Sequence, residues 1–245
     1  SAFSPDVTRI SLAFSADSVA SACLGSSPRL SASDFRRCAS AAIARVTKPT
    51  SAESVLAICA SDEISNVVPA SVAAAKAAFD GEWGQVGPTQ RGKLLVKLAE
   101  IVEREAERLG EIEVRDNGKL IAEMGAQTKY LAEWYRYYGG LADKIEGTVI
   151  PSDKPGIFNF TRYEPLGVIG MITAWNSPLL LLAWKLAPAL AAGNTAVIKP
   201  SEYTSASTLE FMKLIEEAGF PAGVVNTVTG FGQDVGASLV AHRHV

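Results

Sequence analysis

Residues 167–176 read GVIGMITAWN, and residues 194–202 read NTAVIKPSE. Each stretch is a short apolar run typical of a buried strand, and each ends in polar residues. Asn176 closes the first stretch, and Lys199 and Glu202 close the second. A single helical segment separates the two stretches. We therefore expect their strands to run parallel and their polar ends to meet at the carboxyl edge of one sheet, where α/β folds bind ligands.

The alternation of strands and helices continues along the chain and sets the fold class. Gly193-Asn194 and Gly219-Phe220-Pro221 are helix stop signals in the positions that such an alternation needs. Three β-α units with short links predict an α/β protein with an incomplete Rossmann-like parallel sheet, right-handed crossovers and flanking helices. The expected elements are strand 168–173, helix 179–192, strand 196–198, helix 205–218, strand 224–228 and a helix near 235–241.

A helical segment precedes the sheet. An alanine-rich helix is predicted over 72–79, and Pro88 opens a longer amphipathic helix, since proline suits the first helical turn. A third helix over 119–138 carries an aromatic cluster that we expect to pack against a neighbouring domain rather than against a cofactor. Two extended segments with a turn between them follow at 148–151 and 157–163.

Residues 1–60 differ from the rest of the chain. They are rich in Ser and Ala, their periodicity is poor, and their charges are scattered. We interpret them as a low-complexity, poorly structured leader that is either disordered or misassigned through a wrongly joined reading frame. The expected partition is a leader over 1–60 and a folded domain over 61–245.

The composition disfavours several classes of function. The 245 residues carry a net charge of -3, and nucleic-acid binding needs a basic face instead. The longest apolar run, 179–192, is interrupted by Lys185 and Pro188, so no membrane span is predicted. The 3 cysteines and 2 histidines show no metal-ligand spacing. We expect metal-free chemistry, no nucleic-acid or membrane partner, and a cytoplasmic location.

Asn176 is a candidate catalytic residue. Its amide follows a strand directly, where it could donate a hydrogen bond to an oxyanion that develops during acyl-type chemistry. The alternative is that Asn176 caps the following helix, which is a common role for asparagine. Position alone leaves both interpretations open.

Lys199 and Glu202 are candidate nucleotide ligands. A carboxylate at a strand end can accept hydrogen bonds from ribose hydroxyls, and a neighbouring ammonium can share them. The alternative is a solvated loop with a helix cap at Ser201 or Thr204. Glycines in the segment 230–236 follow the third strand and would permit a close approach of the backbone to a ligand.

The combined motifs resemble the aldehyde dehydrogenase superfamily, over about residues 68–245 and about the first half of a family member. The shared features are EPLGVIG at 164–170, AWNSP at 174–178, WKLAPALAAGN at 184–194, KPSE at 199–202, AFDG at 78–81, Arg91 and DNGK at 116–119. The resemblance implies that 61–245 is a partial cofactor-binding domain of this family.

The resemblance also implies roles for individual residues. Asn176 would hold the carbonyl oxygen of the substrate, and Lys185 would serve a charge relay, although a structural role for this lysine is equally open. Trp184 and Leu180 would face the aldehyde tunnel. The residues implied in cofactor binding are Ile172, Thr173, Ala174, Trp175, Lys199, Ser201, Glu202, Gly232 and Gly236.

The implied reaction is NAD(P)-dependent oxidation of an aldehyde to a carboxylic acid by an oligomer of identical chains. NAD is expected in preference to NADP, because Glu202 would repel a ribose 2′-phosphate. The family's nucleophilic cysteine and its glutamate base belong after Val245, so we expect this chain alone to be inactive. The alternatives are a non-catalytic fragment that binds nucleotide or caps an oligomer, and a degenerate product without an independent fold.

Overall fold

A parallel sheet forms the centre of the computed structural model, which describes residues 56–57 and 64–245. The strand order is β1-β6-β5-β4, and the neighbouring strands all run parallel. The predicted α/β class with a Rossmann-like parallel sheet is confirmed. The strands are β1 Leu56–Ala57, β4 Val168–Ile172, β5 Thr195–Lys199 and β6 Val225–Val228.

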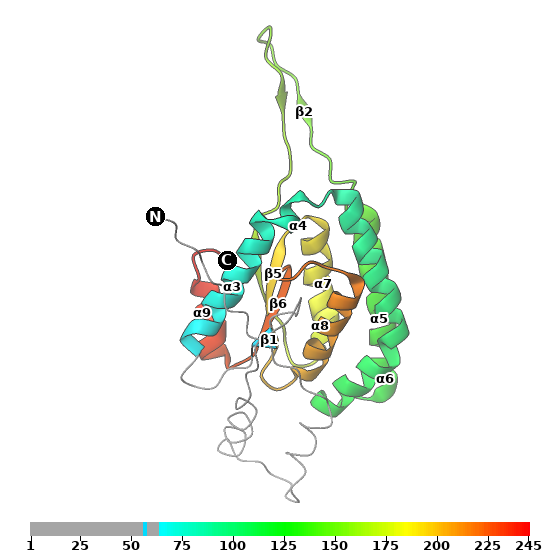
Figure 1. Cartoon of the computed structure of the whole chain (residues 1–245). Coiled ribbons are helices and arrows are strands. Elements are labelled where there is room, and N and C mark those ends of the chain that lie inside the picture. Colours follow the sequence, from blue (N-terminus) through cyan, green and yellow to red (C-terminus); the bar gives the residue numbers. More distant parts are fainter. Residues whose placement is uncertain (1–55, 58–63) are drawn as a thin grey trace, which may run out of the picture.

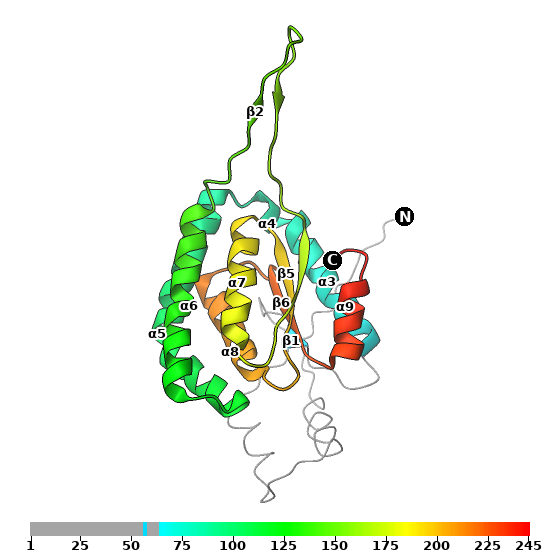
Figure 2. The same ribbon diagram turned by 180° about the vertical axis from the view of Figure 1, so that it is seen from behind.

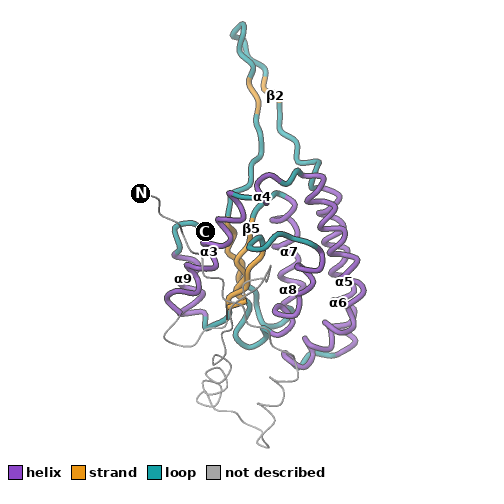
Figure 3. The backbone as a smooth tube through the Cα atoms, in the orientation of Figure 1, coloured by secondary structure: helices purple, strands orange, loops and turns teal. Residues whose placement is uncertain are grey.

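Two crossover helices join the consecutive strands. Helix α7 (Pro178–Ala191) connects β4 to β5, and helix α8 (Ala206–Ala218) connects β5 to β6. Helices α7 and α8 lie on one face of the sheet, and helix α3 (Ile64–Asp80) and helix α9 (Ala237–Ala241) lie on the other (Figures 1 and 3).

The two faces of the sheet bury two separate apolar clusters. Alternate residues of β5 divide between them, since Ile198 packs toward α7 and α8 while Val197 packs toward α3. This division follows from the two-residue period of a strand. The smaller cluster comprises Val68, Val72, Ala75, Val168, Val197, Val228, Val235 and Leu239.

An antiparallel pair of long helices covers α7 and α8 from outside. They are α5 (Pro88–Asn117) and α6 (Ile121–Leu141), and Gly118, with φ 73°, ends α5 in the left-handed conformation that favours glycine. The aromatic cluster of α6 packs against α7 and α8 of the same α/β unit rather than against a neighbouring domain, with Trp134 5.8 Å from Trp184 and Tyr135 5.9 Å from Phe211 between ring centroids.

A β-hairpin extends away from this body (Figures 1 and 2). Strands β2 (Val149–Ile150) and β3 (Asn159–Phe160) pair antiparallel, and the residues of both are exposed. The hairpin leads into the start of β4. It therefore lies at the opposite end of the sheet from the carboxyl ends of the strands.

Three short elements complete the described chain: α4 (Glu82–Gln85), the single wide turn η1 (Gly232–Gly236), and α9 directly after it.

Strand β1 falls within the predicted leader. The rest of 1–63 lies outside the described residues, so the leader and the boundary at residue 60 stay predictions. None of the helices that the structure describes is both long and apolar enough to cross a membrane.

Candidate functional site

The carboxyl ends of three strands bring the predicted site loops to one edge. Ile172 of β4 pairs with Lys199 of β5, and the N–H of Thr173 donates to the carbonyl of Lys199 at 3.1 Å. Ile198 pairs in turn with Thr227 of β6. The loops after β4, β5 and β6 therefore emerge side by side, as parallel pairing requires.

Lys199 and Glu202 form an ion pair at this edge. The Nζ atom of Lys199 donates to Oε2 of Glu202 at 2.8 Å. The lysine side chain is only 3% exposed, whereas the glutamate side chain is 25% exposed. The hydrogen bond from Lys199 lowers the pKa of Glu202 below its ordinary value, so the carboxylate is ionised at neutral pH. The Glu202 carboxylate is therefore partly exposed to solvent, while the Lys199 ammonium bound to it is buried.

Neither Ser201 nor Thr204 caps helix α8. The hydroxyl of Ser201 accepts the N–H of Tyr203 at 3.3 Å, which forms a local turn. The N–H of Ala206, at the first position of α8, donates instead to Oδ2 of Asp116 at 2.9 Å. The solvated-loop interpretation also disagrees with the burial of Lys199.

Asn176 lies exposed in the loop between β4 and α7. Its main-chain carbonyl accepts a hydrogen bond from Nδ2 of Asn117 at 3.4 Å. Its side-chain amide has no hydrogen-bond partner within 56–57 and 64–245. Ser177 is the N-cap residue of α7, and the N–H of Leu179 donates to Oε1 of Glu113 at 2.9 Å. The structure therefore gives Asn176 no capping bond and leaves its amide able to donate to a ligand.

Lys185 binds the strand end rather than a carboxylate. Its Nζ atom donates to the carbonyl of Ile172 at 2.6 Å, although the residue itself is exposed. This contact fixes α7 to the last residue of β4. The geometry supports a structural role for Lys185 and shows no proton acceptor for a relay among the residues described.

The remaining predicted crevice residues offer a mixed surface. Trp175 and Ile172 are 54% and 42% exposed, and Ala174 is exposed as well. Thr173 is buried, and its hydroxyl, like that of Thr204, has no hydrogen-bond partner in the described part of the protein. Exposed apolar surface at the same edge as a partly exposed carboxylate suits a nucleotide, whose base is flat and whose ribose is polar.

Gly232 and Gly236 lie in the wide turn that follows β6. A Cβ atom added at either position would meet nothing within 4 Å. A ligand could therefore approach the backbone closely at this turn. The structure does not bring either glycine into contact with the Lys199–Glu202 pair.

Sequence reasoning missed the contribution of α5 to this edge. Glu113, Asp116, Asn117 and Lys119 all contact the starts of α7 and α8 or the loop before α7. The available signal was a glutamate one turn before DNGK on the buried side of an amphipathic helix. The DNGK segment carries the family resemblance, but its contacts with the helix starts are not visible in the sequence.

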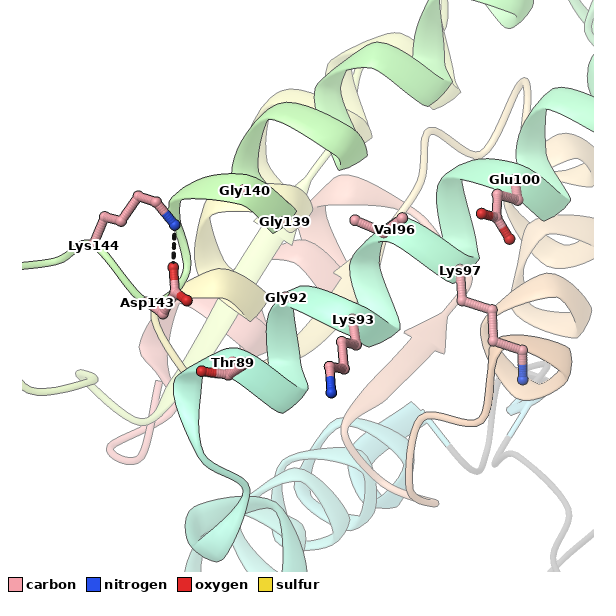
Figure 4. Close-up of a pocket in the computed structure, with 10 residues that line it drawn as sticks. All are labelled: Thr89, Gly92, Lys93, Val96, Lys97, Glu100, Gly139, Gly140, Asp143 and Lys144. Carbon is pink, nitrogen blue, oxygen red and sulfur yellow. Dashed lines mark hydrogen bonds and ion pairs between the residues drawn. The ribbon is translucent and has the colours of Figure 1, made fainter.

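Another depression in the surface lies away from the strand ends. It is an open groove of about 550 Å3 between α5 and α6 (Figure 4), lined by Gly92, Lys93, Lys97, Gly139, Asp143 and Lys144 among others. It lies at the amino end of α5 and contains none of the predicted site residues. Within the described ranges, no group of three metal-ligating side chains is close enough to hold a metal ion.

The parallel sheet and the polar loops at its carboxyl edge define an α/β protein of the nucleotide-binding, Rossmann-like class. Residues 35–245 match the sequence profile of the aldehyde dehydrogenase family. The chain belongs to the aldehyde dehydrogenase family, and the resemblance drawn from its motifs is confirmed.

Relatives and solved structures support this assignment. The chain is 53% identical over 184 residues to a (Z)-2-((N-methylformamido)methylene)-5-hydroxybutyrolactone dehydrogenase of Acinetobacter baylyi, with 75% of this chain and 37% of the relative covered. It is 48% identical over 176 residues to a betaine aldehyde dehydrogenase of Bacillus subtilis, with 71% and 36% covered. The chain thus spans little more than a third of these relatives.

A solved structure of a Bacillus cereus aldehyde dehydrogenase in complex with NAD+ is 43% identical and has a TM-score of 0.70. The match covers 73% of this chain and 36% of that one. A betaine aldehyde dehydrogenase of Staphylococcus aureus, also solved with NAD+, is 39% identical with a TM-score of 0.71, over 73% of this chain and 36% of that one.

Proposed function

We propose that this chain supplies the cofactor-binding half of an NAD(P)-dependent aldehyde dehydrogenase, an oxidoreductase that converts an aldehyde to a carboxylic acid. The observation that carries the proposal is the placement of an unpartnered amide, Asn176, and an ionised carboxylate, Glu202, at the ends of two adjacent parallel strands. Family membership and the NAD+ complexes of related structures support the same conclusion.

In this proposal the Glu202 carboxylate accepts hydrogen bonds from the hydroxyls of the adenosine ribose, and Lys199 holds that carboxylate in place. Ile172, Thr173, Ala174, Trp175 and Ser201 line the crevice, and the backbone at Gly232 and Gly236 lies against the cofactor. A nicotinamide cofactor bound there would supply the acceptor for the hydride of the aldehyde carbon. A 2′-phosphate would meet the charge of Glu202, so we propose that NAD is preferred and NADP is bound more weakly.

Asn176 acts on the substrate in this proposal. Its exposed amide donates a hydrogen bond to the carbonyl oxygen of the aldehyde, which stabilises negative charge as the carbonyl is attacked. Lys185 is proposed as a positioning residue, because its ammonium is already bound to the carbonyl of Ile172. That bond keeps α7, which begins directly after the Asn176 loop, against the strand end.

The attacking cysteine and the glutamate base implied by the family are not assigned to described residues. The three cysteines, Cys23, Cys38 and Cys59, lie outside the described part of the chain. We propose that this chain alone binds and orients cofactor and carbonyl but does not turn over. The proposed location is the cytoplasm.

A second role is proposed for the hairpin. Phe158 and Phe160 are 73% and 57% exposed, their rings lie 5.5 Å apart, and Val149 on the other strand is 63% exposed. Such apolar surface on a projecting two-stranded arm favours burial against another copy of the chain. We propose a homo-oligomer with this contact. The same hairpin contact would also allow a non-catalytic form of the chain to cap an oligomer.

The proposed function is tested by titrating NAD+ into the purified chain while the intrinsic tryptophan fluorescence, to which the half-exposed Trp175 contributes, is followed. Saturable quenching is expected, and it should weaken in Glu202→Gln, which keeps the shape of the side chain but loses its charge. Glu146→Gln, on the approach to the hairpin, is the matched control. Equal NAD+ affinity in Glu202→Gln and the unsubstituted chain would refute the ribose assignment.

A further inference from the structure

A single buried carboxylate joins the starts of two helices. Glu113, near the end of α5, is 1% exposed. Its Oε1 atom accepts both the N–H of Leu179 at 2.9 Å and the hydroxyl of Ser207 at 3.2 Å. Leu179 lies in the first turn of α7, and Ser207 lies in the first turn of α8. The same oxygen atom therefore links the two helices that follow β4 and β5.

Asp116 makes a second contact of this kind on the same helix. Its Oδ2 atom accepts the N–H of Ala206, the first residue of α8, at 2.9 Å. The first N–H groups of a helix lack partners within that helix, and the helix dipole favours a negative charge beside them. The N-cap residues of α7 and α8 make no side-chain capping bond of their own. Helix α5 supplies the missing partners for both.

The end of α5 also holds the loop before α7. Asn117 donates to the main-chain carbonyl of Asn176 at 3.4 Å, and the ammonium of Lys119 lies 3.3 Å from the hydroxyl of Ser177. One segment, 113–119, thus contacts both the loop that carries Asn176 and the start of the helix that follows Glu202. It lies behind these groups and is not itself among the predicted ligands.

We propose that Glu113 and Asp116 are positioning residues of the candidate site, which set the distance between Asn176 and the Lys199–Glu202 pair by capping α7 and α8. The inference rests on the proposed function of those two loops. In the described structure neither carboxylate contacts the Asn176 amide or the Lys199–Glu202 pair, so both act through the helix starts. A displacement of about 1 Å between binding groups is enough to weaken a preorganised site.

The test compares two substitutions of one side chain. Glu113→Gln keeps an acceptor oxygen for Leu179 and Ser207, whereas Glu113→Leu fills the same space without an acceptor. Glu107→Gln, an exposed position on α5, controls for charge. Val102→Ala, buried on α5 away from the helix starts, controls for lost stability. NAD+ affinity is measured by fluorescence titration, and amide hydrogen exchange of segments 176–181 and 204–209 is measured by mass spectrometry.

Glu113→Leu is expected to weaken NAD+ binding about tenfold and to accelerate exchange in both segments, since the caps are lost. Glu113→Gln should stay within about threefold of the unsubstituted chain, because a carbonyl oxygen still accepts the bonds. Val102→Ala should lower the Tm without changing affinity, and Glu107→Gln should change neither.

Unchanged affinity and unchanged exchange in Glu113→Leu would overturn the inference. If the unsubstituted chain binds no NAD+, the proposed function fails on its own, and the inference is then decided by exchange alone. Faster exchange in both segments supports positioning, and equal exchange refutes it. Should Glu113→Leu unfold, Asp116→Ala decides the matter, because it removes only the bond to Ala206 and should accelerate exchange in 204–209 alone.

Discussion

The ammonium of Lys199 and the carboxylate of Glu202 lie 2.8 Å apart, with the lysine almost completely buried and the glutamate at the surface. A buried charge is tolerated only when it is paired, so Glu202 is required by the fold as well as by the proposed ligand. Protonation of Glu202 would remove its charge and leave the Lys199 ammonium without its partner, so the stability of the pair depends on pH.

The first prediction concerns acid stability. The hydrogen bond from Lys199 lowers the pKa of Glu202 below its ordinary value of 4.5. A lowered pKa in the folded state stabilises the protein above the ordinary pKa, and this contribution is lost as the pH falls through the folded value. Urea unfolding at a series of pH values should show a steeper loss in the unsubstituted chain than in Glu202→Gln. Parallel curves would contradict the assignment.

The opposite pH dependence is expected at Glu113. Burial raises its pKa, while the bonds from Leu179 and Ser207 oppose this rise. Because the folded state holds the proton more tightly, the free energy of unfolding should decline as the pH rises from the ordinary glutamate pKa to the raised one. Glu113→Gln should flatten this decline. The control is Glu107→Gln, whose pH profile should match that of the unsubstituted chain.

Asn176→Ala tests the proposed catalytic amide in a form of the protein that oxidises aldehydes. We expect a loss in kcat of about a hundredfold or more, with little change in KM for the cofactor, because the amide stabilises charge that develops only during reaction. Asn66→Ala, at an exposed position on α3, is the matched control and should retain normal turnover. Near-normal turnover of Asn176→Ala would refute the proposed role of its amide in stabilising the carbonyl oxygen.

Trp83 offers a prediction about the core. It is buried, and its Nε1 donates to the carbonyls of Gly193 and Asn194 at 3.0 and 3.1 Å. Trp83→Phe leaves both carbonyls without this donor and should lower the free energy of unfolding by about 1–3 kcal/mol in urea titrations. Trp175→Phe, at a half-exposed site, should change stability by less than about 0.5 kcal/mol.

Two glycines of the long helices should respond in opposite directions to alanine. A Cβ atom at Gly92 would lie 2.5 Å from the carbonyl oxygen of Gly139, so Gly92→Ala forces α5 and α6 apart and should lower the Tm. Nothing lies within 4 Å of a Cβ atom at Gly125. Gly125→Ala should therefore stabilise the chain by about 0.5–1 kcal/mol, as in other helix interiors.

The strands and helices of the sheet were predictable because their local signals agree with the fold. The strands predicted over 168–173 and 196–198 are observed at Val168–Ile172 and Thr195–Lys199, and Pro178 and Gly219 lie where α7 begins and α8 ends. These signals depend on neighbours in the chain, so the sequence alone displays them.

The supports of the site were not predictable in the same way. The bond from Leu179 to Glu113 joins residues far apart in the chain, and a buried glutamate in an amphipathic helix resembles any other polar position until the fold is known. The burial of Lys199 was equally hidden, because a lysine after a strand is usually solvated. Local patterns predicted the candidate ligands, and tertiary packing shows which residues hold their loops.

The sheet separates two apolar clusters of unequal size, and this division has a consequence for how the protein opens. The buried apolar residues of α3 and α9 belong to the smaller cluster, with only the partly buried Ala78 of α3 reaching the larger one, to which α5 to α8 contribute. Layers with fewer buried contacts open at lower free energy. Limited proteolysis should therefore cleave in or near α3 and α9 first and leave a resistant core of α5 to α8 with the sheet still attached.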